Sequence, residues 1–175
     1  MSPHTTTTLI NRHADALTQL GVKILGIVDV NPESAKRLAD AYDTVVVSDL
    51  AQIAGDLDMV HICTPSAFHI PYAKIAMEAG CHVVMEKPMA TNLEDAQALV
   101  ELARIHGVQL MIDFNHRFRT GFQTLLEQVQ SGRLGDIINV TFSRTGLLGG
   151  NAGSPLPVAR LHARTAAPPR WLRSP

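Results

Sequence analysis

Cys81-His82-Val83-Val84-Met85-Glu86-Lys87-Pro88 is the stretch that decides the fold. Residues 81–85 are mostly apolar, which is typical of a strand that is buried on both faces of a parallel sheet. The strand pattern stops where the charged pair and the proline begin. Helical patterns flank it over residues 71–79 and 92–106, and each is followed by a glycine that suits a helix end. The stretch therefore predicts a strand between two crossover helices.

The same alternation of short apolar runs and longer amphipathic runs continues outward in both directions. Asn31 is expected to cap a helix that has Pro32 in its first turn. Alternation of this kind predicts an α/β fold with a Rossmann-like, doubly wound parallel sheet. The other strands are expected at residues 22–30, 45–47, 59–63 and 108–114, and the other helices at residues 34–42 and 49–54.

The two ends of the chain depart from this pattern. Residues 1–10 are rich in threonine, show no strand pattern and are expected to be an atypical N-terminus. Residues 119–154 hold a helical stretch and, at 137–144, an alternating strand pattern, which predicts the start of a second, α+β domain. Residues 155–175 show neither helical nor strand periodicity and contain no acidic residue. This unpatterned tail resembles the translation of a high-GC gene in the wrong reading frame.

Composition excludes several classes of function. The net charge of −1 gives no basic surface for nucleic acid or for an anionic membrane. No run approaches the roughly 20 apolar residues that cross a bilayer, and the N-terminus has no signal-peptide pattern. Cys63 and Cys81 lie in separate strand-like runs and form no CxxC pair, so we expect buried thiols in a reducing cytoplasm.

Polar side chains follow the predicted strands at their carboxyl ends, where doubly wound sheets bind ligands. They are Asp29, Thr64-Pro65, Glu86-Lys87 and Asn115-His116-Arg117. An acidic group at the position of Asp29 can accept hydrogen bonds from both ribose hydroxyls, which favours NAD over NADP because it repels a 2′-phosphate. The alternative for Asp29 is a solvated turn residue before the proline.

Three other side chains have competing interpretations. Lys87, at the mouth of the sheet, suits proton transfer, and the alternative is a surface lysine paired with Glu86. His69 either lines a cofactor cleft or is a polar residue at the start of a helix. His61 and Cys63 share one strand face, but two ligands do not make a zinc site, so core packing and no metal are expected.

Taken together, these motifs resemble the Gfo/Idh/MocA oxidoreductase family, which includes glucose–fructose oxidoreductase and inositol dehydrogenases. The resemblance runs from about Asn11 to Ser154. It implies a dinucleotide-binding Rossmann-like domain over residues 11–118 and then a domain with an open sheet that carries substrate and oligomer contacts. The matching segments are His13-Ala14-Asp15-Ala16-Leu17, Val28-Asp29-Val30-Asn31-Pro32, Ile62-Cys63-Thr64-Pro65 with His69, residues 79–88 and Asn115-His116-Arg117-Phe118.

The resemblance also implies the chemistry and the site. The chemistry is hydride transfer between a sugar or polyol carbinol and a nicotinamide, with a protein base for the hydroxyl proton. Lys87 would be the catalytic residue, touching the substrate hydroxyl from a chain with a cis Lys87–Pro88 bond. Arg117 would face the substrate. The implied cofactor-binding residues are Asp29, Thr64, Pro65, His69, Glu86, Lys87 and Asn115.

The chain also departs from the family's pattern. The glycine-rich turn should occupy residues 5–10, with glycines at Thr5, Thr7 and Ile10, and none is present. The strand before that turn, and the Asp and His that the family's second domain supplies, are not recognisable either. We therefore expect a truncated dehydrogenase that is impaired or inactive and lacks most of the oligomerisation sheet. The alternatives are a non-catalytic module that binds a dinucleotide or sugar, and a fragment with no function of its own.

Overall fold

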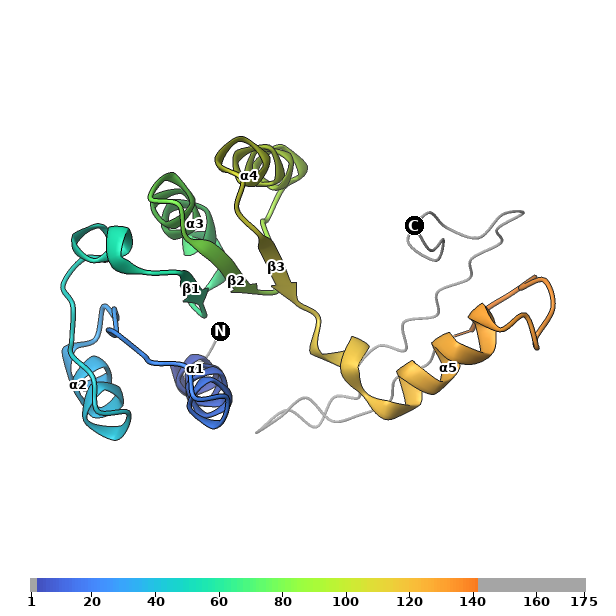
Figure 1. The fold of residues 1–175 in the computed structure, drawn as a ribbon, viewed down its shortest axis with the longest axis horizontal. Coiled ribbons are helices and arrows are strands. Elements are labelled where there is room, and N and C mark those ends of the chain that lie inside the picture. Colours follow the sequence, from blue (N-terminus) through green and yellow to red (C-terminus); the bar gives the residue numbers. More distant parts are fainter. Residues whose placement is uncertain (1–2, 142–175) are drawn as a thin grey trace. The chain divides into compact units, whose positions relative to one another are not determined.

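A computed structural model describes residues 3–141 of the chain, with side chains from residue 10 onward (Figure 1). It divides into two compact units, residues 1–114 and 115–175, which are described separately. The unpatterned tail expected at residues 155–175 lies outside the described range.

The first unit is built on a three-stranded parallel sheet in the order β1-β2-β3. The strands are β1 (Met59–Ile62), β2 (His82–Glu86) and β3 (Leu110–Asp113), and the crossovers are α3 (His69–Glu78) and α4 (Leu93–His106). Glu86 pairs in register with Asp113, so β2 and β3 end side by side. The α/β, Rossmann-like fold expected from the sequence is confirmed.

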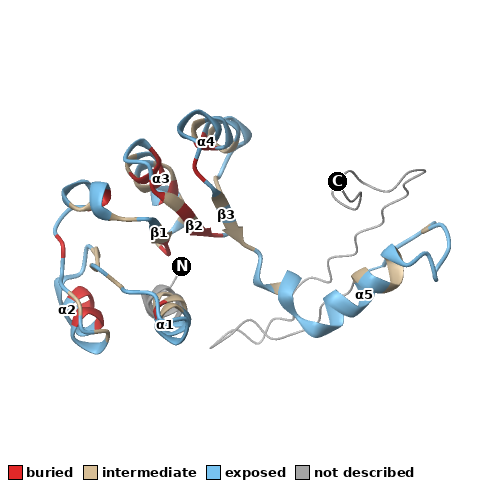
Figure 2. Cartoon of the chain, in the orientation of Figure 1, coloured by how far each residue is buried: buried red, intermediate tan, exposed pale blue. Residues whose placement is uncertain are grey.

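The hydrophobic core lies between this sheet and the two crossover helices (Figure 2). Val83 and Met85 project from β2, and both are almost completely buried. Leu99 of α4 and Met77 of α3 are fully buried as well. Ala73 and Ala76 give α3 a small-residue face, which allows the helix to pack closely on the strands.

Helix α2 (Pro32–Ala41) begins as the sequence predicts. The Asn31 side chain accepts hydrogen bonds from the backbone N–H groups of Glu33 and Ser34, and Pro32 occupies the first turn. On the inner face, Ala35 and Leu38 are buried. The predicted cap and helix are therefore both confirmed.

The continuous strands expected at residues 22–30 and 45–47 are not formed. The two segments meet in a single parallel bridge, Ile27 with Val46, in which the Ile27 N–H donates to the Val45 carbonyl at 2.9 Å. In the doubly wound order 3-2-1-4-5-6, the first strand separates these segments from the strand equivalent to β1. No described residue before Val22 is in a strand, so residues 22–30 have a hydrogen-bonded neighbour on one side only. Apolar sequence alone does not make a strand without partners.

The approach of these two segments also explains one glycine. A Cβ atom added to Gly26 would lie 2.7 Å from Cγ2 of Val47. Real Cβ atoms essentially never show so short a contact, so a side chain at this position would require the Val47 side chain to shift. Glycine at position 26 therefore allows the two segments to approach without that rearrangement.

Helix α1 (Pro3–Gln19) takes up the N-terminal region. It runs without a break across residue 10, so the threonine-rich residues belong to the same helix as His13 and Ala14. Residues 5–10 form no tight turn of the kind that binds phosphate. Ala14 is buried, and the helix thus packs on the sheet-containing unit.

The second unit contains η4 (Asn115–Phe118) and α5 (Thr120–Gln130). The helix confirms the helical stretch expected within residues 119–154. Of the strand expected at 137–144, residues 137–141 form no regular strand and the remainder lies outside the described range.

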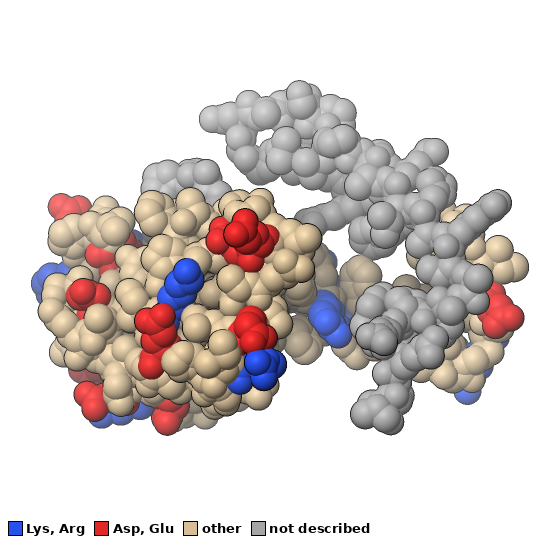
Figure 3. Space-filling view, turned by 90° about the horizontal axis from the view of Figure 1, so that it is seen from above, with Lys and Arg blue, Asp and Glu red and all other residues tan. Residues whose placement is uncertain are grey.

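Charged side chains of both signs are intermixed on the face drawn in Figure 3. Exposed pairs one helical turn apart occur in α2 and α4, such as Lys36 with Asp40 at 2.8 Å. Within residues 3–141, no helix has both the length and the apolar character needed to cross a membrane.

Candidate functional site

The carboxyl ends of the three strands bring polar residues to one edge of the sheet. Thr64 follows β1, Glu86 is the last residue of β2, and Asp113 is the last residue of β3. Glu86 is buried, with only 5% of its surface exposed, although it carries an acidic group. A buried carboxylate needs partners, because removing an ion from water costs a desolvation free energy of about several kcal/mol.

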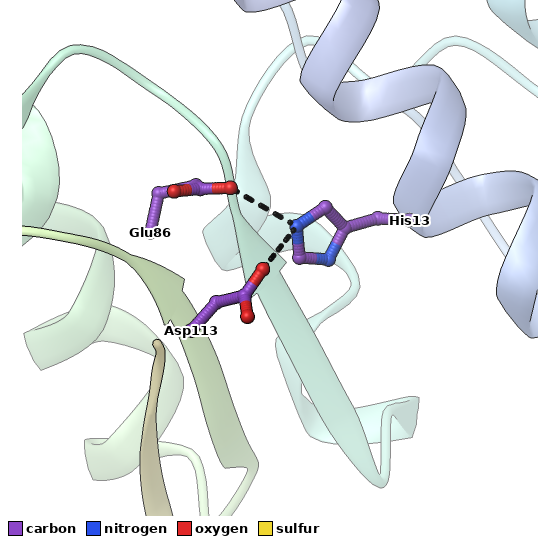
Figure 4. Close-up of side chains that lie close together, drawn as sticks. All are labelled: His13, Glu86 and Asp113. Atoms are coloured by element: carbon purple, nitrogen blue, oxygen red, sulfur yellow. Dashed lines mark hydrogen bonds and ion pairs between the residues drawn. The ribbon is translucent and has the colours of Figure 1, made fainter. Parts of the chain in front are cut away.

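Helix α1 supplies that partner through His13 (Figure 4). The Nε2 atom of His13 lies 3.5 Å from Oε1 of Glu86 and 3.6 Å from Oδ2 of Asp113. All three side chains are mostly buried. Glu86 is one of the site residues expected from the sequence, whereas His13 and Asp113 are not among them. Asp113 was hidden inside an apolar strand pattern, and its position at the strand end was the available signal.

His61 of β1 completes this cluster from the second side of the His13 ring. The two Nδ1 atoms are 3.0 Å apart, and the rings meet edge to face. Burial, and then the charge of His13, lower the pKa of His61 to about 4, so its ring is neutral near neutral pH. A neutral His61 can accept a hydrogen bond at Nδ1 from the Nδ1–H of His13. The Nε2 atom of His61 is buried and has no hydrogen-bond partner.

His69 joins the two loops that leave the sheet at this edge. Its Nε2 atom lies 2.9 Å from the Thr64 carbonyl oxygen, and its Nδ1 atom lies 2.9 Å from the Pro88 carbonyl oxygen. The side chain is 1% exposed. His69 does open α3, but it is a buried link between two loops rather than a solvated residue at a helix start.

The Glu86-Lys87-Pro88 motif has the backbone that the resemblance implies. The Lys87–Pro88 peptide bond is cis. The Lys87 N–H donates to Oε2 of Glu86 at 3.3 Å, while the Lys87 residue itself is exposed. Glu86 lies beside His13, and no ion pair between Glu86 and the Lys87 ammonium is seen among the described residues.

The remaining candidate residues lie in three places. Pro65 is exposed next to Thr64, whose Oγ1 atom is buried without a hydrogen-bond partner. Asp29 is half-buried, and its carboxylate accepts from the Asn31 N–H at 2.9 Å, so part of it serves the turn before α2. Asn115 and Arg117 are exposed in η4 of the second unit, where the Arg117 carbonyl accepts from the Gln123 side chain.

Neither cysteine is suited to nucleophilic chemistry. Burial, and then the charge of Glu86, raise the pKa of Cys63 to about 12. Burial also raises the pKa of Cys81, whose Sγ donates to the Ala54 carbonyl at 3.0 Å. Both cysteines are free and buried, as expected from the sequence.

We therefore expect iodoacetamide to alkylate Cys63 far more slowly in the native chain than in the urea-unfolded chain. A rise in pKa from 9.0 to about 12 lowers the thiolate fraction by about 1000-fold at mildly alkaline pH. Mass spectrometry after timed labelling measures the two rates. Equal rates in the native and unfolded chains would contradict the buried position of Cys63.

Comparison with known proteins identifies the family of the chain. Residues 5–114 match the Gfo/Idh/MocA family model, described as an oxidoreductase family with an NAD-binding Rossmann fold. The chain belongs to the Gfo/Idh/MocA family. The resemblance seen in the sequence is thereby confirmed.

Several Gfo/Idh/MocA relatives are dehydrogenases of sugars or polyols. The chain is 38% identical over 127 residues to D-glucoside 3-dehydrogenase of Escherichia coli, covering 71% of this chain and 36% of that protein. It is 35% identical over 117 residues to scyllo-inositol 2-dehydrogenase (NADP(+)) of Bacillus subtilis, covering 66% and 32%. The crystal structure of the WlbA dehydrogenase from Bordetella pertussis, in complex with NADH and UDP-GlcNAcA, matches with a TM-score of 0.71 and 31% identity, covering 74% and 39%. The chain thus spans well under half the length of each.

Proposed function

We propose that this Gfo/Idh/MocA chain is the nicotinamide-binding part of a sugar or polyol dehydrogenase, with NAD as the preferred cofactor. The observation that carries the proposal is the convergence of Thr64, His69 and Glu86 at the carboxyl edge of the sheet. Doubly wound sheets bind their ligands at that edge. Because the chain spans only part of its relatives, the activity of the complete enzyme belongs to the proposal.

The residues at the edge fit the two ribose ends of a dinucleotide. The buried Thr64 hydroxyl has a hydrogen-bond donor and acceptor to offer to a ligand. Glu86 has two carboxylate oxygens beside the loop of Lys87, and Asp29 follows the bridged segment at Ile27. The pyrophosphate has no glycine-rich turn to bind it, because residues 5–10 lie in α1 and include no glycine. We therefore propose weakened cofactor binding and impaired turnover.

Each proposed role follows from a donor or acceptor. Asp29 would accept hydrogen bonds from the adenosine ribose, and Thr64, Pro65 and Glu86 would line the nicotinamide side with His69 holding their loops. When bound, the nicotinamide supplies the hydride acceptor. Lys87 would take the hydroxyl proton at Nζ as the carbinol C–H hydride leaves. Asn115 would contact the cofactor and Arg117 the substrate.

The preference for NAD rests on the Asp29 carboxylate. A negative group at the end of this segment repels the 2′-phosphate of NADP and binds the free 2′-hydroxyl of NAD. Among the relatives, one is named for NADP(+) and the WlbA structure holds NADH. Family membership alone does not choose between them.

The free cysteines, Cys63 and Cys81, support a reducing, cytoplasmic setting as part of the same proposal. We further propose that the complete protein is a homo-oligomer, as the family's open sheet implies.

Fluorescence titration of the purified chain with NADH tests the proposal. We expect saturable binding that Asp29→Asn weakens by about 10- to 100-fold, because a hydrogen bond to a charged group contributes about 1.5–3 kcal/mol. The same variant should lose the preference for NADH over NADPH. Asp56→Asn, at an exposed position in η2 (Ala54–Asp56), is the matched control and should bind like the parent chain.

The titration also separates the alternatives. Saturable binding without turnover of any polyol would favour a non-catalytic binding module. No binding together with a non-cooperative melt would favour a fragment without function and would refute the proposal.

A further inference from the structure

The cluster of His13, Glu86 and Asp113 has a geometry that ion pairing alone does not require. Its three donor atoms, one from each side chain, all lie within 4.8 Å of one another. The Nε2 atom of His13 lies 3.5 Å from Oε1 of Glu86 and 3.6 Å from Oδ2 of Asp113. A tetrahedral ion with bonds of about 2.0–2.2 Å places its ligand atoms about 3.3–3.6 Å apart. The two separations from His13 therefore already match those of a tetrahedral coordination shell.

The donor types select the class of ion. One imidazole nitrogen and two carboxylate oxygens suit a divalent transition metal, zinc above all, and three protein ligands leave a fourth position open. Two carboxylates and one divalent cation sum to zero charge, which removes the cost of burying Glu86 as an anion. The ligands also come from three different elements, α1, β2 and β3 (Figure 4).

The surroundings of His13 support this use of its Nε2 atom. Metal-binding histidines usually direct their second ring nitrogen to a fixed partner, which sets the tautomer. Here Nδ1 of His13 faces Nδ1 of His61 at 3.0 Å. A proton on Nδ1 of His13 leaves the lone pair of Nε2 pointing to the two carboxylates. The register of β2 with β3, in which Glu86 pairs with Asp113, holds those carboxylates next to each other.

We propose that His13, Glu86 and Asp113 bind one divalent transition-metal ion, zinc being the best match, with His61 as the positioning residue behind His13. The ion would tie α1 to the carboxyl edge of the sheet. This site goes beyond dinucleotide binding: it shares Glu86 with the proposed cofactor site, but its three ligands are complete within the first unit and need no bound cofactor. The competing interpretation is an ion pair only, in which a proton on Nε2 takes the place of the metal.

Calorimetric titration of the untagged, chelator-treated full chain with Zn²⁺ tests the site. We expect one ion per chain and a higher melting temperature with zinc. Asp113→Asn and His13→Ala should each weaken binding by at least about 100-fold, more than the 10- to 100-fold typical of outer partners. His61→Phe should fall within that smaller range. His106→Ala, at an exposed position at the end of α4, is the control and should change nothing.

Three results would overturn the proposal. The first is a parent chain that binds no zinc when one zinc ion is supplied per chain, the second is equal zinc affinity of the parent and Asp113→Asn, and the third is a Co²⁺ spectrum that assigns the metal to cysteine. Asp113→Asn keeps the size of the side chain, so it remains informative if His13→Ala does not fold. Substitution of Co²⁺ gives a further readout on the parent chain itself, because a thiolate charge-transfer band would assign the metal to cysteine and refute this ligand set.

Discussion

Met85→Ala is expected to lower the free energy of unfolding by about 2–5 kcal/mol, the range for truncating a buried methionine, leucine or isoleucine. Met85 lies on the central strand β2, is 0% exposed and belongs to the cluster between the sheet and helices α3 and α4. Truncation removes its contacts and leaves a cavity that the paired strands cannot close, since β2 has neighbours on both sides. Urea denaturation followed by circular dichroism measures the change.

Met111→Ala is the matched control for this experiment. Met111 sits on the neighbouring strand β3 but is 43% exposed. Its truncation should change the free energy of unfolding by no more than about 0.5–1 kcal/mol. Equal losses for the two variants would show that the side of the sheet bearing Met85 is not the core.

The second large effect is expected for His69→Phe. Phenylalanine keeps most of the ring volume but removes both ring nitrogens, which lie 2.9 Å from the Thr64 and Pro88 carbonyl oxygens. A neutral imidazole has one N–H and donates to one of these carbonyls. A buried polar group that loses its partner costs about 1–3 kcal/mol, so we expect a loss of that size. Thermal and urea unfolding both report it.

NADH titration of the same His69→Phe variant adds a functional readout, because the two loops that His69 joins carry Thr64 and Lys87. We expect weaker binding as well as lower stability. His106→Phe places the same ring at an exposed position of α4 and should leave both quantities within experimental scatter. If His69→Phe matched His106→Phe in stability, the buried link between the loops would be refuted.

Local patterns in the sequence were sufficient for the elements whose partners are near in the chain. The apolar run before Glu86 became β2, the Asn31-Pro32 signal became a capped α2, and the glycine at position 107 ended α4 in a left-handed conformation with a φ of 66°. Each of these depends on local backbone chemistry or on a crossover helix that directly follows its strand. A short stretch of sequence is enough to predict such features.

Features that depend on distant segments were missed or predicted wrongly. Residues 22–30 have the composition of a strand but lack a second neighbour, so only Ile27 pairs. The cluster at the sheet edge needed His13, which comes from α1 and is far from Glu86 in sequence. Sequence spacing does not predict contacts between residues that come together only when a helix packs against the sheet.

The outer edge of β1 has a consequence for handling the protein at high concentration. β1 is an edge strand whose sequence, Met59-Val60-His61-Ile62, contains no proline, lysine or acidic residue. Natural sheets use such residues at their edges to prevent strand addition by a second molecule. Met59 is 44% exposed beside this edge. We therefore expect β1 to be a site of self-association, and a single lysine at position 59 is a simple means of suppressing it.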